Sequence, residues 1–372
     1  MYKKNSLRGI LPRFRIFFIC LHSIDGIFIL MKHTFTNIII QWYRANGRNL
    51  PWRETKDPYK IWVSEIILQQ TRVAQGISYY LSFIDTFPNV EALASASEEE
   101  VLLLWQGLGY YSRARNMHCA AKQIVEAGGF PVSYKELLKL KGVGKYTAAA
   151  ISSFAFGGVN AVLDGNVFRV LSRYFGIETP IDSASARKQF QLLAQELIDV
   201  KRPALYNQAI MDFGAMQCLP KGADCRMCPL QETCFANRQN MVGELPVKKR
   251  VATQRERCFN YFFVVNENSE FLVQKRCGKD IWQHLYQLPL VETDRLLSPV
   301  EASEMFPAHK VELRVPTMIH VLSHQQLKAQ CFVLYANSDD NKPFEGVWIA
   351  RHSVGDYVFP QLIIRIFDKL FQ

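Results

Sequence analysis

The sequence predicts a mainly α N-terminal region followed by a smaller α+β C-terminal domain. Apolar residues recur at helical spacing from about residue 35 to Cys234. Residues 236–257 are then polar and basic, which is typical of a linker. From Cys258 onward, β-branched and aromatic runs indicate strands. We therefore expect a helical region over 31–235 (parts 54–160, and 31–53 with 161–235), a linker, and a domain over 258–372.

The composition limits the classes of protein that the chain can be. Of its 372 residues, 49% are hydrophobic and 21% are charged, so each part can bury a core. This excludes collagen-like, disordered and polytopic membrane proteins. The nine cysteines are scattered rather than spaced as a small disulfide framework. The net charge of +10 suggests a polyanionic partner such as nucleic acid.

The first 30 residues resemble a signal peptide or a short anchor, because basic residues precede an apolar stretch over 16–31. However, Ser23 and Asp25 interrupt this stretch, and a membrane span needs about 20 apolar residues. A continuous amphipathic pattern starts just after Met31. We therefore expect translation to begin at Met31 and residues 1–30 to be a non-native or disordered leader.

The helical region is read from apolar stripes between glycine-rich breaks. Ile38, Ile39, Trp42 and Tyr43 form the first stripe, and Pro58 opens the next helix at its first turn. Glycine pairs mark breaks near residues 107–109, 128–129, 142–144 and 157–158. The apolar pattern continues over 102–105, 120–125, 137–140, 148–156, 167–175, 190–198 and 206–216.

The C-terminal domain begins with a hairpin. The strand-like runs are 259–265 and 271–274, with a turn at 266–269, and another run covers 331–335.

Four cysteines form a tight cluster in the order C-x6-C-x2-C-x5-C, namely Cys218, Cys225, Cys228 and Cys234. Four thiolates within such a short loop can surround one metal centre. Zinc ribbons usually use two separated C-x2-C pairs, whereas this segment has one. The spacing favours a single [4Fe–4S] cluster over zinc or disulfides, in a structural role.

The segment over 140–148 predicts a helix–hairpin–helix. Gly142 and Gly144 flank Val143 and permit a tight turn, and Lys145 begins the following helix. Free N–H groups at a helix N-terminus favour an anion, so the turn can grip a DNA backbone without reading its sequence. An ordinary turn between two helices is the alternative.

Two carboxylates stand out. Glu65 shares a helix face with Ile61, Trp62 and Leu68, so we expect burial to raise its pKa toward that of a general acid. An exposed glutamate on a half-buried helix is the alternative. Asp164 stands where the next helix needs an N-cap, and capping alone would explain it.

Together these motifs resemble the endonuclease III superfamily of base-excision DNA glycosylases, and in detail its MutY-type adenine DNA glycosylases. The resemblance covers roughly residues 35–370. The matching segments are LPWR (50–53), SE (64–65), LQQT (68–71), GLGYYSRARN (107–116), LDGNV (163–167) and NQA (207–209).

The resemblance implies excision of adenine mispaired with 8-oxoguanine or guanine in double-stranded DNA. Glu65 would protonate the flipped adenine, and Asp164 would stabilise the oxocarbenium-like sugar, as in glycoside hydrolysis. Tyr146 and Asn166 would hold these carboxylates. Superfamily members that also cut the strand carry a lysine at the position of Tyr146, so the resemblance implies a monofunctional enzyme.

The resemblance also implies the substrate contacts. Trp52, Arg53, Leu68 and Gln208 would line the adenine pocket. Gln70 and Tyr110 would wedge into the duplex, with Thr71 and Leu108 near the oxidised guanine. Basic residues such as Lys141, Lys145, Arg113, Arg115, Lys221 and Arg226 would contact phosphates.

The C-terminal domain resembles the Nudix-like module with which this family senses 8-oxoguanine. It lacks the G-x5-E-x7-R-E-x2-E-E segment of Nudix hydrolases. The family's Phe-Ser-His loop corresponds to Leu322, Ser323 and His324, of which Ser323 and His324 would contact the oxidised base.

The resemblance implies a monomer acting on DNA in a bacterial cytoplasm, near the nucleoid and without a membrane partner. The alternatives are a superfamily glycosylase for thymine mispairs or oxidised pyrimidines, a non-catalytic iron–sulfur DNA-binding protein, and a Nudix-type nucleotide hydrolase.

Overall fold

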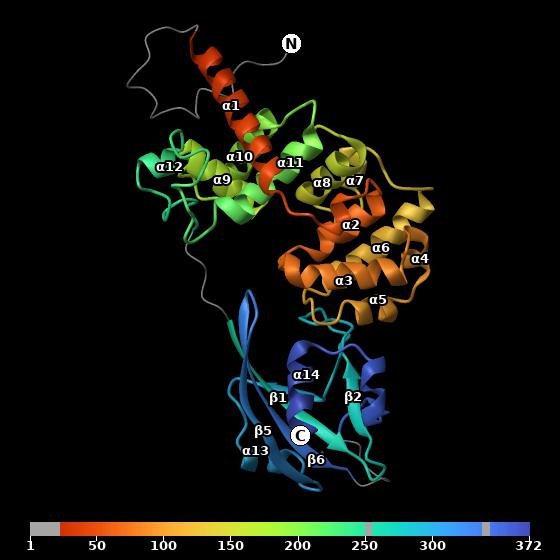
Figure 1. Cartoon of the computed structure of the whole chain (residues 1–372). Helices are drawn as coiled ribbons and strands as arrows, with labels where there is room; N and C mark the ends of the chain where they lie inside the picture. The colour runs from red at the N-terminus through yellow and green to blue at the C-terminus, as the bar shows by residue number, and fades with distance from the viewer. Residues whose placement is uncertain (1–22, 250–254, 337–342) are drawn as a thin grey trace. The chain divides into compact units, whose positions relative to one another are not determined.

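The computed structural model describes residues 23–249, 255–336 and 343–372 (Figure 1). The described chain divides into two units. The first comprises the residues up to Pro58 together with 132–137 and 144–249, and the second comprises 59–131, 138–143 and the residues from 250 onward. Of the expected leader over residues 1–30, residues 1–22 lie outside the described part, and so do residues 250–254 of the expected linker over 236–257. The first helix begins at Ser23, ahead of the expected start at Met31.

The first unit is helical. Its apolar core joins Phe35 and Ile39 of the first helix to Leu171, Phe190 and Ile210 of three later helices, all almost fully buried. The elements are α1 (Ser23–Asn46), η1 (Pro51–Arg53), α7 (Tyr134–Leu137), α8 (Lys145–Phe156), α9 (Gly165–Phe175), α10 (Ala184–Leu197), α11 (Pro203–Asp212), the π-helical η2 (Phe213–Gln217) and α12 (Phe235–Arg238).

The helices that the second unit forms from residues 58–126 lie close together in Figure 1, and their aromatic core contains Trp62, Phe83 and Trp105, all fully buried. Phe83 and Trp105 meet edge to face, with 6.2 Å between ring centroids. A capping box of Ser97 and Glu100 begins one helix. The helices are α2 (Pro58–Ile67), α3 (Val73–Thr86), α4 (Val90–Ser95), α5 (Glu98–Leu104) and α6 (Ser112–Glu126).

The second unit also holds a seven-stranded sheet of order β3-β2-β1-β6-β5, in which β4 pairs with β1 and β7 pairs with β2. The central strands β1 and β6 are parallel, and β1 and β2 form the predicted hairpin. The elements are β1 (Arg255–Val265), β2 (Phe271–Lys275), β3 (Tyr286–Gln287), β4 (Leu290–Thr293), α13 (Pro299–Met305), β5 (Lys310–Val321), β6 (Gln325–Tyr335), β7 (Val347–Ile349), η3 (Arg351–Asp356) and α14 (Gln361–Leu370).

Alternating side chains of β1 supply two separate cores. Phe259 and Tyr261 belong to an apolar cluster with Phe367 of α14. Phe262 belongs to another, with Ala302 of α13. The sheet is therefore covered on both faces, which explains why its central strands read as continuous apolar runs.

Most predicted elements are confirmed, and the differences have local causes. The expected helix over 137–140 ends at Leu137, where the turn before α8 begins. The expected helix over 206–216 stops at Asp212 and continues as the π-helix. The long strand β5 was not predicted, because irregular pairing around Val315 and Met318 breaks its two-residue period. Within the described residues, no helix is long and apolar enough to cross a membrane.

Candidate active site

Asp164 caps α9 and is held from two sides. Its carboxylate accepts the backbone N–H of Val167 at 2.8 Å and the side-chain amide of Asn166 at 2.8 Å. Burial raises the pKa of Asp164, while these hydrogen bonds oppose the rise. The capping role considered from the sequence is therefore present, and it also fixes the carboxylate in one orientation.

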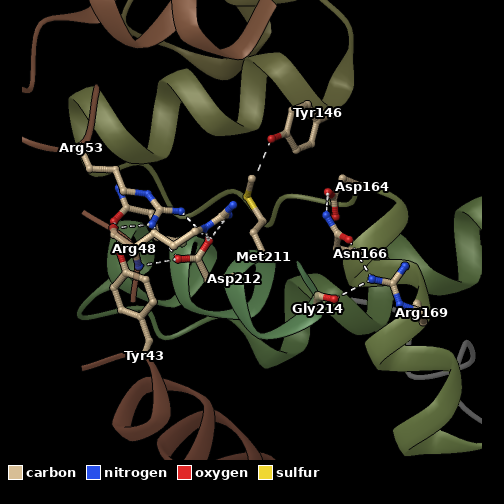
Figure 2. A network of polar contacts seen from close by, with 11 residues as sticks. Tyr43, Arg48, Arg53, Tyr146, Asp164, Asn166, Arg169, Met211, Asp212 and Gly214 are labelled. Atoms are coloured by element: carbon tan, nitrogen blue, oxygen red, sulfur yellow. Dashed lines mark hydrogen bonds and ion pairs between the residues drawn. The ribbon is translucent and has the colours of Figure 1, made fainter. Parts of the chain in front are cut away.

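Asn166 connects this carboxylate to the segment that precedes the cysteines (Figure 2). Its side-chain oxygen accepts Arg169 Nη2 at 2.8 Å, and the same nitrogen donates to the Gly214 carbonyl at 2.6 Å. Arg169 Nε donates to the Cys218 carbonyl at 2.7 Å. A Cβ at Gly214 would lie 2.7 Å from Asn166 Cβ, so the π-helix can approach α9 this closely only with glycine there.

The helix–hairpin–helix turn adopts the expected form. Gly142 has a φ of +76°, and a Cβ there would lie 2.7 Å from Asn116 Cβ, so both conformation and space require glycine. Val143 is buried, and Gly144 precedes the first turn of α8. Lys145 is exposed at that helix N-terminus, where backbone N–H groups favour an anion.

Tyr146 follows on α8 and is half-buried. Its hydroxyl lies 3.7 Å from Met211 Sδ on α11, as Figure 2 shows. Tyr146 is half-buried, whereas the neighbouring Lys145 is exposed. The two side chains therefore lie in different surroundings.

Arg53 is bound by an acid that the sequence did not reveal. The fully buried Asp212 accepts Arg53 Nη1 at 2.7 Å and Nη2 at 2.8 Å, and it also pairs with Arg48 (Figure 2). Burial opposes ionisation of Asp212, but the two arginines outweigh burial and lower its pKa to about 2. Asp212 therefore stays ionised and locks the guanidinium of Arg53 in a bidentate pair.

The other predicted pocket residues of the first unit lie around Arg53. Trp52 is buried beside it in η1. The Tyr43 ring stacks on the Arg53 guanidinium, at 5.6 Å from the ring centroid. The Tyr43 hydroxyl donates to Gln208 Oε1 at 3.0 Å. Gln208 and Asp212 are one turn apart on α11, so a single helix face organises this part of the site.

Replacing Asp212 by asparagine is expected to lower the free energy of unfolding by about 2–4 kcal/mol, because two arginines lose their shared buried counter-ion. The depressed pKa means that this stabilisation is full above pH about 4 and is lost as the pH falls through about 2. Denaturant unfolding measures the effect.

The matched control is Glu256→Gln, which breaks an exposed pair with Lys328 (2.7 Å) and should cost less than about 1 kcal/mol. Equal losses in the two variants would contradict a special contribution from Asp212.

Glu65 lies in the second unit, on α2, and only 6% of its surface is exposed. Its neighbours on the same helix, including Ile61, Trp62 and Ile66, are buried as well. The alternative of an exposed glutamate is therefore wrong. An acid in such surroundings is shielded from bulk water.

Two loops of the second unit carry the predicted duplex contacts. Gln70 is exposed and has a φ of +58°, between half-buried Leu68 and Thr71. Tyr110 has a φ of +47° and is 44% exposed, whereas Leu108 is buried. Both exposed side chains therefore project from an unusual backbone conformation.

Two arginines that were expected to contact phosphates donate to backbone carbonyls. Arg113 is half-buried and donates to backbone carbonyls, including that of Gln69 at 2.5 Å. Arg115 Nη1 donates to the Gln283 carbonyl at 2.7 Å. The phosphate role predicted for this pair is wrong for Arg113, because its donors are directed into the protein.

Ser323 and His324 lie at the turn between β5 and β6 and are exposed. The Ser323 hydroxyl is 3.3 Å from His324 Nδ1. Leu322 is half-buried and packs against the apolar cluster beneath α14. Packing of Leu322 thus anchors the turn, and the polar side chains of Ser323 and His324 remain exposed.

The four clustered cysteines line one apolar cavity of the first unit, together with Val170, Tyr174 and Leu230 among others. Arg173 lies at this cavity, with Nη1 at 3.4 Å from Cys218 Sγ. Within the described part of the chain, no group of three or more His, Cys, Asp or Glu side chains is arranged to hold a metal ion. The donor set is four thiols around a shared space.

Asp212, Arg169 and Arg113 were missed or misassigned by the sequence reasoning. Each has at least one partner that lies 44 or more positions away in the chain, and residue spacing does not reveal such a contact. Only Asp212 left a weak trace, because an acid inside the apolar pattern over 206–216 is unusual for a buried helix.

Comparison with known proteins matches both parts of the chain. Residues 63–196 match the HhH-GPD superfamily of base excision DNA repair proteins, and residues 260–369 match the NUDIX domain. The adenine DNA glycosylase of Buchnera aphidicola subsp. Schizaphis graminum is 32% identical over 347 residues, which cover 90% of this chain and 98% of that protein. The human adenine DNA glycosylase is 43% identical over 216 residues, 55% of this chain and 40% of the human protein.

Solved structures match the helical part. A thermostable thymine-DNA glycosylase aligns with a TM-score of 0.53 and 29% identity, over 56% of this chain and 97% of that one. A trapped endonuclease III–DNA covalent intermediate aligns with a TM-score of 0.50 and 20% identity, over 56% and 98%, which shows the fold alone. With a relative matched over nearly its whole length, the chain belongs to the adenine DNA glycosylase family, within the helix–hairpin–helix base excision repair proteins.

Proposed function

We propose that this enzyme is a monofunctional DNA N-glycosylase that excises adenine mispaired with 8-oxoguanine or guanine. The observation that carries the proposal is the pair of carboxylates, a buried Glu65 and a doubly anchored Asp164, in a chain of this family. We further propose that it works as a monomer on DNA in a bacterial cytoplasm.

Glu65 acts as the general acid. Protonation of the adenine ring at N7 makes the base a neutral leaving group, and a shielded carboxylic acid can donate that proton. Asp164, as the carboxylate, stabilises the positive charge that develops on the sugar as the glycosidic bond breaks. Water then forms a bond to the sugar carbon that carried the base, and the proton that it releases restores the acid form of Glu65. Asn166 holds the Asp164 carboxylate at 2.8 Å. In this proposal Tyr146 also helps to hold the catalytic carboxylates.

The remaining site residues bind the substrate. Trp52, Arg53, Leu68 and Gln208 receive the flipped adenine, and Gln70 and Tyr110 fill the space that it leaves in the duplex. Flipping costs a few kcal/mol, which these contacts and the backbone grip of the hairpin (142–145) offset. Thr71, Leu108, Ser323 and His324 contact the opposite 8-oxoguanine.

A duplex with a single A:8-oxoguanine pair tests this function. Under single-turnover conditions, alkali-labile sites should appear at the adenine, and a matched A:T duplex should stay intact. Without alkali the strand should remain whole, because Tyr146 cannot form the imine through which a lysine cuts DNA. Lack of adenine release from both A:8-oxoguanine and A:G would refute the proposal, and release from thymine mispairs would favour the superfamily alternative.

We also propose that the four cysteines hold one [4Fe–4S] cluster, because they line a shared apolar cavity and their spacing lacks the two C-x2-C pairs of a zinc ribbon. The cluster would stabilise the loop over 218–234. Protein purified without oxygen should contain about four iron atoms per chain and absorb visible light.

The Cys228→Ser variant should lose most of this iron, whereas Cys119→Ser, which changes an exposed cysteine elsewhere, should keep it. Bound zinc in place of iron, or equal iron in both variants, would contradict the cluster.

A further inference from the structure

Arg113 of α6 gathers five backbone carbonyls from two separate segments of the second unit. Both guanidinium nitrogens at its tip are used, and each serves a different segment. Nη1 donates to the carbonyls of Ile66 (2.8 Å), Ile67 (3.1 Å) and Gln69 (2.5 Å), and Nη2 donates to those of Leu108 (3.4 Å) and Gly109 (3.2 Å).

The first segment is the end of α2 and the loop that follows it. The last carbonyls of a helix have no partner within the helix, and Arg113 supplies donors for Ile66 and Ile67. It then binds the carbonyl immediately before Gln70, whose φ of +58° is unfavourable for a residue with a side chain. The hydrogen bond from Arg113 therefore supports this loop in its observed form.

The second segment also contains a residue with a side chain and a positive φ. Tyr110 has a φ of +47°, and Arg113 binds the carbonyl of Gly109 directly before it. The guanidinium carbon lies over two rings, 5.6 Å from the centroid of Tyr110 and 5.2 Å from that of Trp105. Trp105 Nε1 donates to the Gly109 carbonyl at 3.1 Å, which closes the arrangement.

Arg113 is charged at neutral pH, although burial lowers its pKa to about 10. A planar guanidinium can donate from its edge to the carbonyls of both segments while its faces remain available to aromatic rings. A lysine has neither the fork nor the plane. The arrangement therefore requires arginine specifically.

We propose that Arg113 is a positioning residue that sets the loops of Gln70 and Tyr110 together, so that both side chains can enter the duplex when the adenine leaves it. This rests on the proposed function, in which these two side chains are the wedges. The tip of Arg113 donates to the protein backbone, so in this proposal it acts through the two loops.

The test is Arg113→Lys in a Glu65→Gln background, in which base release does not interfere. The probe is a duplex with 2-aminopurine beside the target adenine, whose fluorescence rises when the adenine leaves the stack. We expect the extruded fraction to fall about tenfold or more, because small misplacements of positioning groups have large effects. Affinity for an undamaged duplex should change little, since the hairpin grips the backbone.

A second substrate separates positioning from general damage. With the adenine in an unpaired bulge, little strand opening is required, so Arg113→Lys in the Glu65-containing enzyme should regain most of its excision rate. Hydrogen exchange in the folded variant should increase in both 68–72 and 107–111. These readouts of extrusion and exchange do not depend on excision, so failure of the proposed function would be seen separately, as absence of base release in the unmodified enzyme.

The matched control is Arg257→Lys. Arg257 also lies over a ring, that of Phe259 at 4.8 Å, and pairs with Asp280 and Glu292, but on β1. The Arg257→Lys variant should leave adenine extrusion and hydrogen exchange in both loops unchanged. Unchanged extrusion in Arg113→Lys, faster exchange in one loop only, or an equal effect of Arg257→Lys would overturn the proposal.

Discussion

Replacing Glu65 by glutamine is expected to slow adenine release from an A:8-oxoguanine duplex by about 10²–10⁴-fold, the usual contribution of a general acid. Glutamine has nearly the same size and stays in the buried position on α2, but its amide cannot deliver a proton to the base. Affinity for the duplex should remain close to that of the unmodified enzyme. Single-turnover excision and a binding titration measure the two effects.

The matched control is Glu91→Gln on α4, an exposed glutamate of the same unit. It should excise adenine at the unmodified rate. A Glu65→Gln enzyme that still excises adenine efficiently would remove Glu65 from the role of general acid, and an enzyme that no longer binds the duplex would assign it to binding.

Asp164→Asn is the second large effect, with an expected loss of about 10²–10³-fold in the rate of base release, because the charge that stabilises the sugar cation disappears. Asparagine caps a helix about as well as aspartate, so α9 should keep its stability. The substitution therefore separates two roles that coincide in the native residue, whose side chain accepts the N–H of Val167.

Asp164→Ala is the informative comparison, because it removes both roles. It should lose activity to a similar degree and also lose about 1 kcal/mol of stability with the cap. If Asp164→Asn were active and only Asp164→Ala were impaired, capping would be the whole contribution of this residue.

The acidic limb of the pH–rate profile provides a further check on the same residue. Burial raises the pKa of Asp164, so its carboxylate becomes protonated at a higher pH than an ordinary aspartate, whose pKa is about 3.9. Activity should therefore decline on acidification before it would for an exposed carboxylate, and that limb should be absent from the residual activity of Asp164→Asn.

Local features of the site were predictable because their causes lie within a few residues. The hairpin glycines, the cap position of Asp164 and the apolar face around Glu65 are all read from near neighbours, and the structure agrees with each. The β1–β2 hairpin follows from a turn between two runs. The strand β5 was not predicted, because its irregular pairing interrupts the two-residue period that identifies a strand.

The sequence by itself determined the helical and α+β parts, the hairpin, the cysteine set and the family-type carboxylates, since each depends on residue type and short spacing. Only the tertiary structure decided what holds them. Asp212 reaches Arg53 across 159 positions, and Arg113 reaches Gln69 across 44. The partner of a charged side chain is set by the element that packs against it. Once the charge is buried, the partner is required, because an unpaired buried charge is strongly destabilising.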